Sequence, residues 1–245
     1  MLKFRTKYSS DPLWIKELEV MFNKYVSKEE LFTYRNYILK NKIPERYPLK
    51  MRDHGLYAKP DCYVKWASIL MMFDKIKTTN MKVVDLGTGE GPLPHIISEQ
   101  GYDVTGVDNM RINHPFKTSL VQMVLRDAID FLLDIEDESV DVFTDSCSVT
   151  HFDFGGGQNP GWKSVFSGVY QKLKPGGYFL VATDCHYKPE RKRDGEFLLG
   201  DEIAATAKEC GFMLTTEFNS DSMDISYRNE SKEIDLTVAT FMLKK

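Results

Sequence analysis

A short apolar strand that runs into alternating glycines is the feature that most constrains how this chain can fold. Lys82–Leu86 is rich in valine and other apolar residues, and glycines follow at positions 87, 89 and 91. Glycine allows a sharp turn and lets another group approach the main chain closely. The helical pattern of residues 93–100 comes next and ends at Gly101. This order predicts a buried strand whose carboxyl end faces a ligand at the amino end of a helix.

The alternation of strands and helices continues to the end of the chain. Strands are expected at 103–107, 120–125, 140–144, 178–182, 212–218 and 234–243, with helices at 128–133, 164–173 and 199–210. This order favours an α/β fold built on a doubly wound, mostly parallel sheet. Only about fifteen residues without a strong helical pattern separate the last two strands, so these two are expected to be antiparallel neighbours.

The chain divides into a helical extension at residues 1–80 and an α/β domain at residues 81–245. A capping-box pattern at 27–30 marks the start of one helix, and apolar residues between about 61 and 75 recur at helical spacing. We expect the extension to pack on the domain. A second interpretation, in which residues 52–63 form a lid over a ligand, stays open.

Composition argues against several classes of protein. Hydrophobic residues make up 42% and charged residues 28%, which supplies enough apolar material for a packed core. The net charge of -4 argues against a general nucleic-acid-binding surface. No apolar run approaches the length of a membrane span, and the first residues show no signal peptide. The four cysteines form no Cys-x-x-Cys pair, so we expect no metal site, no disulfides and a cytoplasmic location.

Acidic residues follow the first three strands of the domain. Asp85 precedes the first glycine by two residues, Asp108 lies seventeen residues past Gly91, and Asp127 follows the third strand. A carboxylate at the second position accepts hydrogen bonds from ribose hydroxyls in nucleotide-binding folds. A dinucleotide-binding loop would place its third glycine where this chain has Pro92, which argues against a nicotinamide-dependent oxidoreductase.

Taken together, these motifs resemble the class I S-adenosylmethionine-dependent methyltransferases. The resemblance covers about residues 80–245 and rests on five motifs in order: the loop 85–91, Asp108, Asp127, the strand and acid at 140–146, and the Leu-Lys-Pro-Gly-Gly turn at 173–177. It implies a seven-stranded sheet of order 3-2-1-4-5-7-6 with strand 7 antiparallel. It also implies S-adenosylmethionine as the cofactor and S-adenosylhomocysteine as the product.

Nine positions match cofactor-binding positions of this family. By resemblance, the amino-acid and ribose portions of the cofactor would lie near Asp85 (through water), Gly87, Thr88, Gly89 and Ser146. The ribose hydroxyls and the adenine would lie near Asp108, Asn109, Asp127 and the backbone N–H of Ala128.

Direct methyl transfer aligns a nucleophile with the methyl group, and a hydroxyl nucleophile also needs a base for its proton. His151 follows the fourth strand of the domain, and Asp184 and His186 follow the fifth. These three are the candidate catalytic residues. Cys147 and Cys185 are expected to be wall or core thiols, because direct transfer needs no covalent enzyme intermediate.

The acceptor is expected to be a small molecule that is methylated on oxygen or nitrogen. A basic cluster between Lys188 and Arg193 makes an anionic substrate one possibility that stays open. The glycine-rich segment 155–162, which ends in Trp162, is interpreted as a mobile loop or a gate over the substrate. Two alternatives remain: a methyltransferase that acts on protein or nucleic acid, and a non-catalytic binding protein that kept the fold.

Overall fold

The strand that precedes the glycines lies at the centre of a parallel arrangement. A computed structural model of the chain describes residues 60–89, 93–110, 120–152, 161–186, 200–215, 227–228 and 235–245. In it, β1 (Lys82–Leu86) pairs in parallel with β2 (Asp103–Asp108) on one side and with β4 (Val140–Ser146) on the other. Four of the five residues of β1 are buried, as expected for a central strand covered on both faces.

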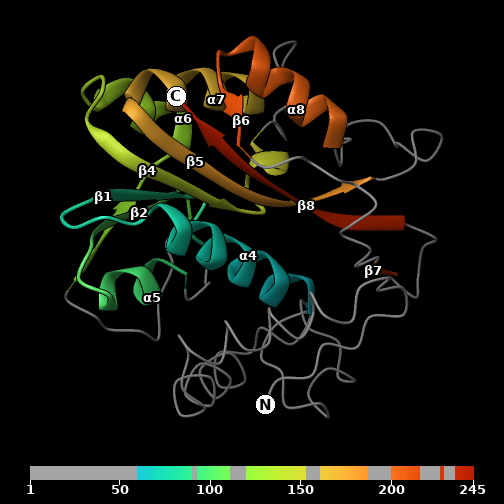
Figure 1. The fold of residues 1–245 in the computed structure, drawn as a ribbon, viewed down its shortest axis with the longest axis horizontal. Helices are drawn as coiled ribbons and strands as arrows, with labels where there is room; N and C mark the ends of the chain where they lie inside the picture. Colours follow the sequence, from blue (N-terminus) through green and yellow to red (C-terminus); the bar gives the residue numbers. More distant parts are fainter. Residues whose placement is uncertain are drawn as a thin grey trace.

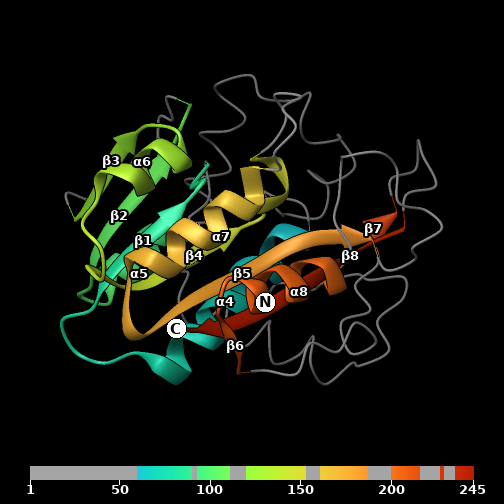
Figure 2. The same ribbon diagram turned by 90° about the horizontal axis from the view of Figure 1, so that it is seen from above.

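Within the part of the chain that the structure describes, eight strands form one sheet in the order β3-β2-β1-β4-β5-β8-β6, with β7 paired to β8. The remaining strands are β3 (Val121–Leu125), β5 (Leu173–His186), β6 (Met213–Leu214), β7 (Tyr227–Arg228) and β8 (Asp235–Lys244). Figure 2 shows them side by side from β3 to β8. Strand β8 runs antiparallel to both β5 and β6. The expected strand order and the expected antiparallel strand are therefore confirmed, with β8 in the place of the seventh strand.

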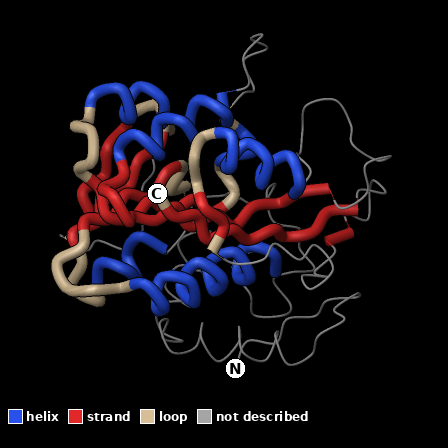
Figure 3. Tube along the Cα trace, turned by 45° about the horizontal axis from the view of Figure 1, so that its top comes forward, coloured by secondary structure: helices blue, strands red, loops and turns tan. Residues whose placement is uncertain are grey.

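Helices cover both faces of the sheet (Figures 1 and 3). One face carries α4 (Pro60–Ile76) and α5 (Leu93–Glu99). The opposite face carries α6 (Ala128–Asp134), α7 (Gly161–Lys172) and α8 (Gly200–Glu209). A single turn of 3-10 helix, η1 (Val149–His151), follows β4.

Helix α4 packs its apolar stripe on the sheet. Trp66, Ile69, Leu70 and Phe73 recur at helical spacing and are all buried. The helix contacts β4, β5 and β8. The proposed division at residue 80 remains a prediction, and the helices expected before residue 60 lie outside the described residues.

Two expectations about the segment between β4 and β8 are corrected. The strand expected at 178–182 is longer and includes the turn before it, because Leu173 already pairs with Val140. The register then shifts, so that the next pair is Val142–Tyr178. Gly176, with φ +81°, belongs to the extra residues in this irregularity. The segment expected to be a loop up to Trp162 ends sooner, since α7 already begins at Gly161. Trp162 is buried on Phe166, so this tryptophan belongs to the core.

Among the described residues, no helix combines the length and the apolar character needed to cross a lipid bilayer.

The core beneath α7 and α8 is an aromatic cluster centred on Phe166. Its ring meets those of Trp162, Phe179 and Phe212 at centroid distances of 6.0, 5.3 and 6.3 Å, in edge-on or steeply inclined geometry. Such pairs stabilise a core beyond the burial of their area. We infer that this cluster fastens α7 and the start of β6 to β5.

Truncating Phe166 to alanine should lower the free energy of unfolding by about 3 to 5 kcal/mol, because it removes a fully buried ring and leaves a cavity. Leu133→Ala is the matched control, because Leu133 is 74% exposed and its loss should cost less than about 0.5 kcal/mol. Denaturant unfolding of both variants checks this expectation. Similar losses in the two variants would contradict the proposed role of the cluster.

Candidate functional site

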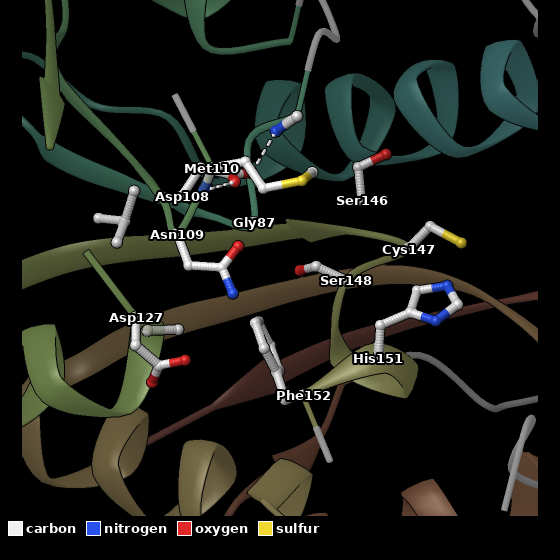
Figure 4. Close-up of a pocket in the computed structure, with 13 residues that line it drawn as sticks. Gly87, Asp108, Asn109, Met110, Asp127, Ser146, Cys147, Ser148, His151 and Phe152 are labelled. Carbon is white, nitrogen blue, oxygen red and sulfur yellow. Dashed lines mark hydrogen bonds between the residues drawn. The ribbon is translucent and has the colours of Figure 1, made fainter. Parts of the chain in front are cut away.

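A pocket of about 530 Å³ lies where the strand order reverses between β1 and β4. Open α/β sheets bind ligands at this position, outside the carboxyl ends of the strands. The pocket is lined by residues at or just beyond the carboxyl ends of four strands: Gly87, Gly89, Val107, Asp108, Asn109, Met110, Asp127, Ala128, Ser146, Cys147, Ser148, His151 and Phe152. Figure 4 places Asp108 and Asp127 at one end, and Cys147 and His151 at the other.

The floor of the pocket depends on a close contact between the loops after β1 and β4. Gly87 and Gly89 both have positive φ, at +62° and +54°. A Cβ on Gly87 would lie only 2.1 Å from the Cβ of Ser148. The hydroxyl of Ser148 donates to the carbonyl of Leu86 at 2.8 Å and also bonds to Asp145. Only glycine at position 87 therefore satisfies both the backbone conformation and the space.

Asp108 fixes the shape of the adjoining wall. Its Oδ2 accepts a hydrogen bond from the backbone N–H of Gly89, and its Oδ1 accepts one from that of Met110, both at 2.8 Å. Each carboxylate oxygen has a second lone pair, so Asp108 can accept further bonds from a ligand hydroxyl. The neighbouring Asn109 also lines the pocket.

Asp127 and Ala128 form the end of the pocket that lies beyond β3. Asp127 is the N-cap of α6, and its Oδ1 accepts from the backbone N–H of Ile129 at 2.8 Å. Asp127 is exposed, while Ala128 is buried. Both were expected at the site, and the structure brings both to the pocket lining.

Asp85 and Thr88 lie outside the pocket lining. Both are buried, and the hydroxyl of Thr88 donates to the carbonyl of Asp85 at 3.1 Å. The carboxylate of Asp85 accepts from the hydroxyl of Thr144 at 2.6 Å. Burial raises the pKa of Asp85 to about 7, against the opposing effect of the Thr144 hydrogen bond. Asp85 therefore lies beneath the glycine loop in this structure.

A second buried acid supports the loop after β4. The carboxylate of Asp145 accepts from the backbone N–H groups of Ser148 and Val149 at 2.9 and 3.1 Å. Burial raises the pKa of Asp145 to about 6. These bonds hold η1 at the carboxyl end of β4 and so place His151 at the pocket.

His151 lies at the end of the pocket opposite Asp108 (Figure 4). Desolvation by the surrounding protein lowers its pKa, although His151 remains exposed on one side. The charge of Asp184 raises this pKa, and the charge of Lys65 lowers it further. A histidine whose pKa lies below the ordinary value of about 6.5 is largely neutral near pH 7. Its neutral imidazole can accept a proton.

Of the other two catalytic candidates, Asp184 does not line the pocket. Asp184, near the end of β5, pairs with Lys65 Nζ at 2.8 Å. The backbone of His186 ends β5, but its side chain lies outside the described residues, as does the basic cluster 188–193. Residues 155–160 of the expected gate are outside them too.

Four lining residues were missed by the sequence analysis: Val107, Met110, Ser148 and Phe152. In the sequence, Val107 is indistinguishable from other apolar residues of a buried strand. Met110 and Phe152 belong to no recognisable motif. The close spacing of Ser146 and Ser148 after a strand was a usable signal for the latter. Cys147 was expected to be a wall or core thiol, and it lines the pocket.

The chain matches the model of one protein family, described as "Methyltransferase domain", over residues 61–232. A curated relative from Botryococcus braunii, "Sterol methyltransferase-like 1", is 33% identical over 129 residues. The match covers 48% of this chain but only 31% of that relative.

Solved structures share the fold at low sequence identity. A Burkholderia thailandensis 1,6-didemethyltoxoflavin-N1-methyltransferase with bound 1,6-didemethyltoxoflavin and S-adenosylhomocysteine matches with a TM-score of 0.56 and 16% identity, covering 90% of each chain. A Haemonchus contortus phosphoethanolamine N-methyltransferase matches with a TM-score of 0.55 and 18% identity, covering 91% of this chain and 59% of that one. The [4+2]-cyclase SpnF matches with a TM-score of 0.58 and 13% identity, over 72% and 79% of the chains. A fold shared with a cyclase does not by itself identify a reaction.

Gly87→Ala should lower the thermal midpoint much more than Gly101→Ala. Both glycines have positive φ, but an added Cβ at Gly101 meets nothing within 4 Å, whereas at Gly87 it collides with Ser148. Backbone strain alone costs about 1 to 2 kcal/mol, and the collision at Gly87 adds to it. Thermal melts of the two variants measure the difference. Equal shifts would show that the contact with Ser148 does not hold the two loops together.

Asp85→Asn should become more stable relative to the wild type as the pH rises from 5 to 8. In the folded protein Asp85 keeps its proton up to about pH 7, whereas its ordinary pKa is 3.8. The folded state therefore binds more protons than the unfolded state between these values, and it loses stability as the pH rises through them. Asparagine cannot ionise, so the relative gain should be about 2 to 3 kcal/mol, given that one pKa unit corresponds to about 1.4 kcal/mol.

Urea unfolding at both pH values measures this gain, with Asp103→Asn, at the exposed start of β2, as the control. A gain of the same size in the control, or none in Asp85→Asn, would contradict the account of the buried carboxylate.

Proposed function

We propose that this chain, which belongs to the S-adenosylmethionine-dependent methyltransferase family, transfers a methyl group to a small molecule that carries an oxygen or nitrogen nucleophile. The observation that carries this proposal is the pocket at the switch point of the sheet, with left-handed Gly87 and Gly89 facing the buried carboxylate of Asp108. When bound, S-adenosylmethionine supplies an electrophilic methyl group on a sulfonium centre.

The residues of the pocket fit this cofactor. Asp108 offers a carboxylate, held in place by two backbone N–H groups, that can accept bonds from ribose hydroxyls. Val107, Met110 and Phe152 supply apolar surface for a purine ring. The cavity of about 530 Å³ lies within the range of ligand pockets.

We assign the cofactor-binding residues by their places in the pocket. Asn109, Asp127 and Ala128 would hold the adenine, and Gly87, Gly89 and Ser146 would line the ribose and the amino-acid portion. Asp85 would act on the amino-acid portion from beneath, through water, because it does not line the pocket. Thr88 would act through its backbone, since its hydroxyl donates to Asp85.

The acceptor would lie at the opposite end, beside His151. A hydroxyl or amine nucleophile must lose a proton during transfer, and His151 is the candidate base. Its lowered pKa keeps the imidazole free to accept that proton near neutral pH. Asp184 and His186 remain candidates for contact with the acceptor from the end of β5.

Two structural neighbours support a small acceptor, because each has a small molecule bound besides S-adenosylhomocysteine. One is a 1,6-didemethyltoxoflavin-N1-methyltransferase with 1,6-didemethyltoxoflavin bound, and the other holds phosphomonomethylethanolamine. We include in the proposal that the acceptor is anionic, because the positive charges of the basic cluster 188–193 would attract it. A cytoplasmic location would suit the free thiols of Cys147, Cys185 and Cys210.

The test combines binding and turnover. Thermal melts with S-adenosylmethionine, S-adenosylhomocysteine and NAD should give a shift with the first two alone, because a bound ligand stabilises the folded state. Release of S-adenosylhomocysteine is then measured with pools of small amines, phenols and phosphate-bearing amines, and separately with proteins and RNA. Turnover with a small-molecule pool supports the proposal. Turnover only with protein or RNA would overturn the assigned acceptor class, and a shift with NAD alone would overturn the cofactor.

Asp108→Ala should weaken binding of S-adenosylhomocysteine by about 1 to 3 kcal/mol, the usual cost of losing a hydrogen bond to a charged group. Asp103→Ala, at the exposed start of the same strand, is the matched control and should bind as the wild type does. Isothermal calorimetry measures both affinities. Unchanged affinity in Asp108→Ala would remove this carboxylate from the cofactor site.

A further inference from the structure

A buried lysine pairs with two groups at the edge of the sheet where the pocket opens. Lys65, on α4, is only 2% exposed. Its Nζ donates to Asp184 Oδ2 at 2.8 Å and to Cys147 Sγ at 3.0 Å. Cys147 Sγ in turn lies 3.1 Å from the same carboxylate oxygen. Residues 65, 147 and 184 are far apart in the sequence, and the fold brings them together at the carboxyl ends of β4 and β5.

This arrangement is costly to build. A buried ammonium group is tolerated only when it is paired and hydrogen-bonded, and breaking such a pair by removing one partner is strongly destabilising. Apolar residues of similar size would often serve stability equally well. The position of the cluster therefore suggests a role in the site.

Cys147 connects the cluster to the pocket. It lines the cavity, and its φ of +76° is unusual for a residue with a side chain. Its backbone N–H donates to the carbonyl of Ala182 at 2.9 Å, so the chain is held in this conformation from both the main chain and the side chain. Burial raises the pKa of its thiol to about 12, so the S–H keeps its proton and donates to Asp184.

The charges of the cluster act on His151. Among the described residues, the charges of Asp184 and Lys65 alter its pKa, and they act in opposite directions. Figure 4 shows Cys147 and His151 at the same end of the pocket. Because Lys65 is paired with Asp184, His151 experiences the field of a nearly neutral pair instead of that of a bare carboxylate.

We propose that Lys65 is a positioning residue of the site, which cancels the charge of Asp184 beside His151 and holds Cys147 in the wall against which the methyl acceptor lies. The proposal rests on the proposed methyl transfer, in which His151 accepts the proton of the acceptor. Lys65 itself touches neither the cofactor nor the acceptor in this account.

The test is an NMR pH titration of the His151 imidazole in the full-length protein, with its resonance assigned by the variant His151→Gln. Lys65→Met leaves the carboxylate of Asp184 uncompensated, so the pKa of His151 should rise by about half a unit or more. Asp184→Asn leaves the ammonium uncompensated, so the pKa should fall. The double variant Lys65→Met/Asp184→Asn should return it close to the wild-type value, and Lys65→Arg, which keeps the charge, should change it little.

Lys172→Met is the matched control. Lys172 is also buried and pairs with Asp137 at 2.6 Å, but neither residue lines the pocket. Its loss should leave the titration of His151 unchanged. If Lys65→Met does not fold, the opposite shift in Asp184→Asn and its reversal in the double variant still test the proposal.

No shift in either single variant, a shift that persists in the double variant, or an equal shift in Lys172→Met would overturn the role of Lys65. Binding of S-adenosylhomocysteine is measured by calorimetry on the same samples. Failure of the wild type to bind would count against the proposed function, whereas the titration tests the cluster separately.

Discussion

The contact between Gly87 and Ser148 is the constraint on which the pocket depends. It brings the loops after β1 and β4 together where the strand order reverses, and it leaves no room for a side chain at position 87. Ser148 locks the contact by donating to the carbonyl of Leu86. Because parallel strands end at one edge of the sheet, this junction sets the distance between the Asp108 end of the pocket and the His151 end. The apolar sheet and its helices supply the stability that holds the junction closed.

Polar groups beneath this junction are costly and highly organised. Asp85 and Asp145 are buried, and both have a raised pKa because burial penalises their charged forms. Asp145 accepts a hydrogen bond from the backbone of η1, whereas Asp85 accepts one from the hydroxyl of Thr144. Together with left-handed Cys147, they show strain and desolvation gathered around the site, as is common where function requires a fixed geometry. The site is therefore supported by buried groups as much as by the residues that face the cavity.

Much of the fold and part of the site follow from local patterns in the sequence. The doubly wound sheet was predicted because strands, helices and glycine turns alternate, the strand order followed from the resemblance to the methyltransferase family, and Asp108 was placed by its distance from the glycine loop. The position of Asp85 could not be predicted, because the sequence pattern of a carboxylate at a strand end is the same whether its side chain faces a pocket or lies beneath it. Lys65 could not be found either, since its partner Asp184 lies 119 residues away. Trp162 was misread because a preceding glycine-rich stretch hides where a helix begins.

We propose above all that the pocket between β1 and β4 holds S-adenosylmethionine with its ribose on Asp108. A crystal structure of the chain with S-adenosylhomocysteine tests this most directly. We expect both ribose hydroxyls within hydrogen-bond distance of the Asp108 carboxylate, the adenine beside Asn109 and Ala128, and the sulfur directed toward the end that carries His151. A ligand bound elsewhere, or one in this pocket with its ribose away from Asp108, would contradict the account.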